Sequence, residues 1–440
     1  MKLHHTSGPG VRRSTAVLAG TLVAVTSLVL TGCGAGGGTT AAGEDSITVL
    51  VEAGGHGELQ PIADQYKKDT GTSVTFVELP YDGLYNRLNS EFSSGSLSFD
   101  VAALDAIWLP TFAEALTPLD DIFTDEVQSD LFPALVTEAQ VDGSFVGMPA
   151  WTNSEILYYR TDLFEDPTQQ QNFKAEYGYD LAAPKTWEQY ADMAKFFTQD
   201  TDGDGKVDVY GTDVKGAVET EWLATLSQAG ENEMVVGDDG SVSLGDEKSL
   251  EALNFYTSLL PYAPSGAAQL DWAGSQNLFN QGQLAMMRFW AHAYKQIPAD
   301  SAVSGKVGVA TMIGGPGGVA GVPGAWYLSV PSATSKQEKA LEFVKYAYEH
   351  NELSVDTDLG LASRISVLEK YQDKPGFENY KPLIDTLNAP ATIPRPATSQ
   401  WQEIVDSALI PMIQKAVVPG ADNQKLLDAA KAQVQSIIGD

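Results

Sequence analysis

The sequence predicts an α/β protein in which mostly parallel strands are flanked by helices. Residues 47–51 and 100–104 are short apolar runs, typical of strands buried on both faces, and residues 74–79 are also strand-like. Apolar residues recur at helical spacing over residues 59–66 and 84–92, between these strands. The order strand–helix–strand–helix–strand predicts a parallel sheet with helices packed on its faces.

The sheet predicts where a ligand binds. In open α/β sheets, ligands bind beyond the carboxyl ends of the strands. The loops after Val51, Leu79 and Leu104 are therefore the first places to search.

The N-terminal 32 residues predict an export signal. Arg12 and Arg13 precede an apolar stretch, residues 16–30, which is shorter than the ~20 residues of a permanent membrane-spanning helix. The stretch ends in Leu-Thr-Gly-Cys, with the only cysteine of the chain, Cys33. This ending resembles the lipobox of bacterial lipoproteins, which implies cleavage after residue 32, lipid on Cys33 and attachment to the membrane by that anchor alone. The alternative is a chance cysteine after a secretory signal.

Composition narrows the classes of protein further. The formal net charge of −31 excludes nucleic acid and anionic lipid as partners held by charge. The 43% of hydrophobic residues excludes a disordered chain. Residues 33–45, rich in Gly, Thr and Ala, predict a flexible tether, and the length of the remainder suggests two domains.

An Asp-Gly-rich segment resembles the start of a calcium loop. Asp200, Asp202, Asp204 and Asp208 occupy positions one, three, five and nine, and the backbone carbonyl of Lys206 would be a further ligand. The twelfth position is glycine instead of the bidentate glutamate of an EF-hand. A structural calcium ion, remote from any ligand, is one interpretation, and an acidic surface turn is the other. No cofactor is expected to be required.

Motifs spread along the chain resemble the family of extracellular solute-binding proteins that includes the maltose- and trehalose-binding proteins. The matching segments are Gly54-Gly55, residues 70–74, 100–108, 116–120, 147–149, 156–160, 282–290 and 324–326. The resemblance implies the two-lobed type II periplasmic-binding-protein fold, with each lobe a mostly parallel sheet flanked by helices. It places the N-terminal lobe at 46–150 and 309–352, and the C-terminal lobe at 151–308 and 362–440.

The resemblance also implies a carbohydrate site between the lobes. Sugars require aromatic plates for their apolar faces and polar groups that bond hydroxyls in pairs. Asp105 and Trp108 follow the third strand, although a helix-capping Asp with a core Trp would look the same. Asn153 stands where the family has an Asp. The other candidates are Trp151, Trp290, Trp326, Arg395 and Trp401, with weaker cases for His56, Glu58, Tyr81, Trp222 and Arg364.

The predicted function is that of a monomeric, extracytoplasmic lipoprotein on the outer face of the bacterial membrane, which captures a carbohydrate and delivers it to the permease subunits of an ABC importer. One alternative is a surface glycosidase or lyase, because paired carboxylates can be nominated in so acidic a chain. No His-Glu-x-x-His, Gly-x-Ser-x-Gly or P-loop motif supports an enzyme. The other alternative is a binder of a non-sugar solute, such as an amine. Arg364 and Arg395 near the expected site argue against a polyamine.

Overall fold

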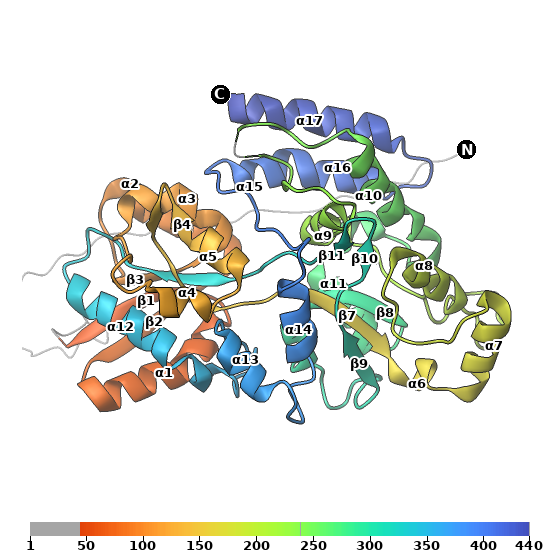
Figure 1. Ribbon diagram of the computed structural model, residues 1–440, viewed down its shortest axis with the longest axis horizontal. Helices are drawn as coiled ribbons and strands as arrows, with labels where there is room; N and C mark the ends of the chain where they lie inside the picture. Colours follow the sequence, from red (N-terminus) through yellow and green to blue (C-terminus); the bar gives the residue numbers. More distant parts are fainter. Residues whose placement is uncertain (1–44, 238, 440) are drawn as a thin grey trace, which may run out of the picture. The chain divides into compact units, whose positions relative to one another are not determined.

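The strands predicted near the N-terminus lie in one five-stranded sheet with the order β2-β1-β3-β12-β6. Figure 1 labels β1, β2 and β3 of this sheet. The structure is a computed structural model and describes residues 45–439, apart from residue 238. β1 is parallel to β2 and β3, whereas β12 is antiparallel to β3 and β6. Four of the five strands therefore run in one direction, as predicted. The bounds are β1 Ser46–Glu52, β2 Ser73–Leu79, β3 Val101–Asp105, β6 Met148–Trp151 and β12 Trp326–Ser329.

Helices α1 (Gly55–Thr70) and α2 (Tyr81–Ser94) pack against β1 and β2, and α12 (Gln337–Glu349) contacts β6 and α1. The apolar stripe of α1 is buried, as its helical spacing predicts. Gly71 ends α1 in the left-handed conformation, with φ 82°, and its amide donates to the carbonyl of Lys67.

A second sheet contains three strands, β8 (Met286–Trp290), β7 (Glu155–Arg160) and β9 (Val307–Ala310), with β7 in the middle. β7 is antiparallel to both neighbours, so the expectation of a mostly parallel sheet in each lobe is wrong for this one. The residues between β7 and β8 form a series of helices instead of alternating strands and helices. No strand–helix–strand unit therefore requires parallel pairing here.

The chain passes from the first sheet to the second through Thr152, Asn153 and Ser154, between β6 and β7. The sequence predicts the return near residue 309. β9 pairs with β7 through Ala310, and the first sheet is entered again only at β12. The short strand β9 lacks a sequence signal that distinguishes one sheet from the other. The limits of the lobes stay a prediction.

The remaining elements surround the two sheets. After β3 come η1 Ala106–Trp108, α3 Leu109–Phe112, η2 Ala113–Ala115, α4 Asp125–Ser129, α5 Pro133–Ala139, β4 Gln140–Val141 and β5 Ser144–Phe145. After β7 come α6 Thr161–Phe164, α7 Pro167–Tyr177, α8 Trp187–Phe196, α9 Thr220–Gln228, α10 Glu247–Ser258, η3 Leu260–Tyr262, η4 Ala267–Gln269 and α11 Trp272–Asn280. Next are η5 Ala291–Tyr294, β10 Gly314–Gly315 and β11 Gly318–Val319.

The C-terminal part is helical, with α16 beside α17 (Figure 1). One segment in it, η7, is a π-helix that ends at Leu409, two residues before Pro411. Proline has no N–H to donate, which permits the wider turn. In the described residues, no helix is both long enough and apolar enough to span a membrane. The elements are η6 Asn351–Ser354, α13 Ile365–Tyr371, α14 Tyr380–Leu387, α15 Trp401–Ile404, η7 Val405–Leu409, α16 Ile410–Ala416 and α17 Asn423–Gly439.

Candidate ligand-binding cleft

A cavity of about 520 Å³ lies between the two sheets and the C-terminal helices. Glu52 and Asp105 enter it from the last residues of β1 and β3, as the rule for parallel sheets requires. Trp326 lies beside Asp105 because β12 begins where the antiparallel β3 ends. The lining residues are Glu52, Tyr81, Asp105, Ile107, Asn153, Ala217, Val218, Glu219, Thr220, Trp272, Trp290, His292, Gly324, Trp326, Arg395, Gln402, Val405, Asp406 and Ile410.

Asp105 is the centre of a buried polar cluster. Its carboxylate accepts hydrogen bonds from the Tyr81 hydroxyl at 3.0 Å and from the Arg395 guanidinium at 2.8 Å. It also accepts from the amide of Ile107, so Asp105 caps η1 as well. Burial alone would lower the pKa of Arg395, but Asp105 and Glu138 outweigh burial and hold that pKa above its usual value. The Nε of Arg395 is buried and has no hydrogen-bond partner among the described residues.

Asn153 and His292 form a second polar pair. The Asn153 side-chain oxygen accepts from the amides of Ser154 and Ala291, so its nitrogen faces His292 Nδ1 at 2.7 Å. Burial lowers the pKa of His292 to about 4, so the ring is neutral at physiological pH. Since Nδ1 must accept from Asn153, Nε2 carries the proton and can donate to a hydroxyl.

Three tryptophans supply the apolar surface of the cavity. Trp272 and Trp290 contact each other with ring centroids 5.4 Å apart, and Trp326 stacks on Trp151 at 5.8 Å. The ring of Trp290 also packs on the backbone of Gly324. Aromatic faces of this kind fit the C–H face of a sugar ring.

A buried ionic cluster lies behind Trp272. Lys215 pairs with Asp213 at 2.7 Å and with Glu221 at 2.5 Å, and Arg288 pairs with Glu221; all four side chains are fully buried. The Lys215 ammonium lies 5.2 Å from the centroid of the Trp272 ring. The cluster therefore fixes both Trp272 and the segment before α9, which forms one wall of the cavity.

The structure brings six of the predicted ligand residues to the cavity and excludes seven. Trp108, Trp222 and Trp401 are fully buried in the core and do not line it. For Trp108 the alternative of a core Trp is correct, because it packs between Tyr81, Tyr85 and Trp326. The six are Tyr81, Asp105, Asn153, Trp290, Trp326 and Arg395.

Trp151, His56 and Glu58 also lie outside the cavity. Trp151 lies behind Trp326, and His56 bonds Gln60 within α1. Glu58 is buried and accepts from the backbone amides of Leu359 and Leu361 and from the Thr357 hydroxyl. Its role in the structure is to hold the segment after η6 against α1.

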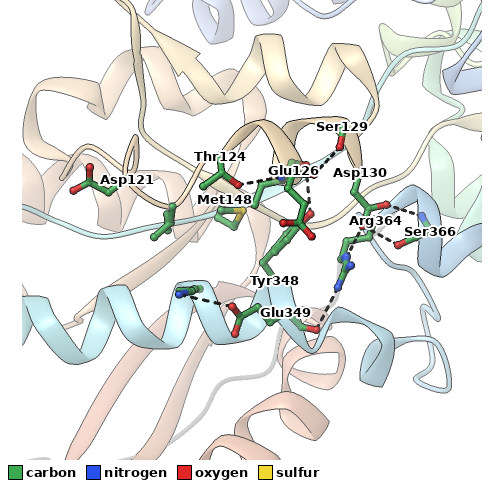
Figure 2. A pocket seen from close by; sticks show the side chains of 13 residues that line it. Asp121, Thr124, Glu126, Ser129, Asp130, Met148, Tyr348, Glu349, Arg364 and Ser366 are labelled. Atoms are coloured by element: carbon green, nitrogen blue, oxygen red, sulfur yellow. Dashed lines mark hydrogen bonds and ion pairs between the residues drawn. The ribbon is translucent and has the colours of Figure 1, made fainter.

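Arg364 lies in another cavity of about 560 Å³, between α4, α12 and α13 (Figure 2). Its guanidinium donates to Asp130 at 2.7 Å and lies over the Tyr348 ring, and Asp130 also accepts from Ser366. These groups satisfy one another and leave little polar capacity for a ligand. The expectation that Arg364 reaches the sugar site is therefore corrected.

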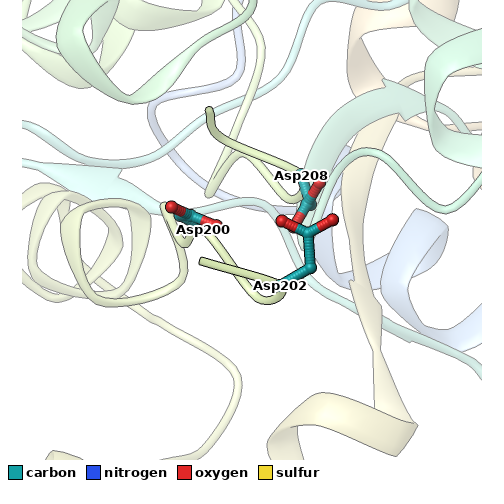
Figure 3. Close-up of side chains that lie close together, drawn as sticks. All are labelled: Asp200, Asp202 and Asp208. Carbon is teal, nitrogen blue, oxygen red and sulfur yellow. The ribbon is translucent and has the colours of Figure 1, made fainter. Parts of the chain in front are cut away.

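The acidic segment forms an exposed turn. Asp200, Asp202 and Asp208 each offer an oxygen, and these oxygens lie within 4.8 Å of one another (Figure 3). Asp204 instead pairs with Lys206 at 2.9 Å. Carboxylate oxygens are ligands that suit Ca²⁺, and calcium binding by these aspartates stays a prediction.

Sequence reasoning missed Glu52, Glu219, Trp272, His292, Gln402 and Asp406. A signal existed for Glu52, because it directly follows Val51, the end of a strand that the sequence predicts. Asp406 lies in η7, and the proline after it predicts an irregular helix there but not its direction.

The fold and the cleft define a solute-binding protein. A sequence model of the family described as bacterial extracellular solute-binding protein matches residues 53–351. The chain therefore belongs to this family.

Individual relatives agree with this assignment. A probable ABC transporter-binding protein of Deinococcus radiodurans is 28% identical over 85% of this chain and 90% of its own. A maltooligosaccharide ABC transporter solute-binding lipoprotein of Streptococcus pneumoniae is 28% identical over 76% of each chain.

Solved structures share the fold. An ABC transporter solute-binding protein of Agrobacterium radiobacter K84 with ribitol has a TM-score of 0.73 at 23% identity, covering 90% of this chain and 99% of that one. The maltose-bound MalE3 of T. maritima has a TM-score of 0.72 at 22% identity, covering 89% and 99%. This likeness establishes the type II periplasmic-binding-protein fold.

Proposed function

We propose that this protein captures a carbohydrate in the cleft and delivers it to the membrane permease subunits of an ABC importer. The observation that supports this most is the combination of Trp272, Trp290 and Trp326 with the Asp105–Arg395 pair in one cavity. The pneumococcal relative, which is named for maltooligosaccharide transport, and the ribitol- and maltose-bound structures support this choice.

Different cleft residues would contact different parts of a sugar. The tryptophan rings contact the apolar ring face, while carboxylates accept from hydroxyls and Nε2 of His292 donates to a hydroxyl. The contacts come from both sheets, so a bound ligand favours a closed arrangement of two lobes over an open one. A closed, loaded form is what a permease can distinguish from the empty protein.

We further propose that the protein is not an enzyme. Carboxylates such as Glu52 and Asp105 lie in the same cavity, and a retaining or inverting glycosidase would need such a pair. Incubation with the bound oligosaccharide distinguishes the two functions. A binding protein returns the sugar intact, whereas hydrolysis products would establish the enzyme.

Attachment through lipid on Cys33 is part of the proposal, and this residue lies outside the described residues. The name of the pneumococcal relative, a lipoprotein, supports it. The Cys33→Ala variant should leave the membrane fraction. Unchanged retention in membranes would contradict a lipid anchor. We also propose that the protein is a monomer. Sedimentation measures its mass in solution and tests this.

The ligand itself is found by a thermal-shift screen of mono- and oligosaccharides. A ligand that binds only the folded state raises the apparent melting temperature, by an amount that grows with its concentration above Kd. Calorimetry then gives the affinity. If polyamines or peptides stabilise the protein and no carbohydrate does, the carbohydrate proposal is wrong.

A further inference from the structure

The cleft holds more acidic than basic side chains. Among its described lining residues, Glu52, Asp105, Glu219 and Asp406 are acidic, and Arg395 is basic. Arg395 is already paired with Asp105 at 2.8 Å. His292 does not add a positive charge, because burial lowers its pKa to about 4.

Two of these carboxyl groups form no ion pair with the described residues. Within the described part of the chain, Glu52 has no hydrogen-bond or ion-pair partner, and Glu219 has only its own backbone amide. Asp406 accepts from the amide of Gln402 at 3.2 Å, which leaves its charge in place. Glu52, Glu219 and Asp406 come from β1, the residue before α9 and η7, so they reach the cavity from different elements.

We propose that Glu52 and Glu219 make the cleft select carbohydrates by charge. Of three sugars that differ at one position, the one with a protonated amine binds most tightly, the one with a hydroxyl less tightly, and the one with a carboxylate least. This inference rests on the proposed function and adds the charge class of the ligand to it.

Burial makes the selection effective. Glu52 and Glu219 are only partly exposed, and Coulomb interactions are stronger in such surroundings than in bulk water because the effective dielectric constant is lower. Burial, with the neighbouring charge of Asp105, raises the pKa of Glu52 to about 7; burial is also the main cause of the raised pKa of Glu219. Neither carboxyl forms an ion pair with a basic side chain in the part of the chain that the structure describes. A ligand ammonium group would therefore favour the ionised form of each carboxyl, whereas a ligand carboxylate would oppose ionisation.

The position of Arg364 outside the cleft supports the selection by charge. If Arg364 lay in the cleft, as the sequence predicts, its guanidinium and that of Arg395 would together neutralise two of the carboxylates. In the structure Arg364 is bound to Asp130 in the other cavity, and this balance is lost.

The test uses ligands matched in shape. Glucose, 6-amino-6-deoxyglucose and glucuronate differ only at C6, and the same three changes at the non-reducing end of maltose give a larger set. Calorimetry at pH 7 and low salt should give at least about tenfold tighter binding for the amine than for the hydroxyl, and about tenfold weaker binding for the carboxylate. High salt should reduce both ratios.

Variants assign the effect to the two residues. Glu52→Gln and Glu219→Gln keep the size of each side chain and should each reduce the preference for the amine severalfold, measured as the ratio of the amine and hydroxyl affinities within the same variant. Glu114→Gln, at an exposed position outside the cavity, is the control and should keep the full preference.

The outcomes separate this inference from the proposed function. Equal affinities for amine and hydroxyl forms, or an unchanged preference in both variants, overturn the selection by charge while carbohydrate binding stands. If none of the six ligands binds but another sugar does, the ranking is likewise overturned. If no carbohydrate binds at all, the proposed function itself fails.

Discussion

The Trp290 ring and the backbone of Gly324 are in such close contact that a β-carbon on this glycine would lie 2.6 Å from the ring. Gly324 also donates its amide to the carbonyl of Asn153, which holds its backbone in place. With a β-carbon on Gly324, the Trp290 ring would therefore have to move, because the backbone of Gly324 could not. The position of the Trp290 ring in the cleft thus depends on the absence of a side chain at Gly324.

Gly324→Ala should therefore weaken ligand binding without unfolding the protein. The methyl group displaces the Trp290 ring from its position, and we expect an affinity loss of about tenfold. Calorimetry with the screened sugar measures it. Gly57→Ala is the control, since a β-carbon there meets no atom within 4 Å. Wild-type affinity in Gly324→Ala would show that the ring position is unimportant.

Trp290→Ala removes the aromatic surface altogether. Loss of a stacking plate in a partly desolvated cleft costs about 2 kcal/mol, or ~30-fold in affinity. Trp290 is partly exposed, so the variant should stay folded by circular dichroism. Tyr371→Ala, which removes an aromatic ring outside the cavity, should bind normally. An unchanged Kd for Trp290→Ala would remove this residue from the site.

Asp105→Asn tests the buried pair with Arg395. The change leaves the guanidinium buried without its charged partner, which should destabilise the protein by about 3 kcal/mol. Binding should weaken as well, because the amide replaces an acceptor for sugar hydroxyls. The double variant Asp105→Asn/Arg395→Gln should recover part of the stability but not the affinity, in urea denaturation and calorimetry respectively. Wild-type stability in the single variant would contradict the pairing.

The acidic turn gives a prediction for metal. If Asp200, Asp202 and Asp208 hold Ca²⁺, the melting temperature should be higher in calcium than in chelator, and Asp202→Ala should abolish the difference. Asp180→Ala, at an exposed acid outside this group, should retain it. Equal melting temperatures for the wild-type protein in both buffers would leave the acidic-turn interpretation standing.

The local parts of the structure could be predicted from the sequence. The first three strands, the helices between them and the end of α1 at Gly71 follow from short-range patterns of apolar residues and glycine. Asp105 was found because the end of a strand in a parallel sheet marks the ligand edge. These features depend on residues close together in the chain.

Long-range contacts account for the errors. Glu58 has the appearance of a cleft residue, but it is occupied by a segment about 300 residues away, at Leu359. Trp222 lies in a helix that is buried all round, and periodicity does not show whether such a helix faces a core or a cleft. Arg395 bonds a residue 290 positions distant, and only the fold brings them together.

The raised pKa of Glu138 gives a prediction of how the free energy of unfolding changes with pH. Burial is the largest cause that raises its pKa to about 7, and one carboxyl oxygen accepts from the Tyr327 hydroxyl while the other has no partner among the described residues. The folded protein thus keeps a proton that the unfolded chain, with the ordinary value of 4.5, has released. The free energy of unfolding should therefore fall as pH rises from about 4.5 to 7, by up to about 3 kcal/mol from this residue.

Glu138→Gln mimics the protonated form and removes this contribution. Urea denaturation of both proteins at pH 4.5, 6 and 8 should give similar stabilities at the lowest pH and a growing advantage for the variant above it. Glu155, whose pKa burial also raises to about 7, keeps part of the slope in the variant, so the difference between the two proteins is the quantity to measure. A difference that stays constant over this range would mean that Glu138 is ionised in the folded state, with Arg395 as the cation that compensates for its burial.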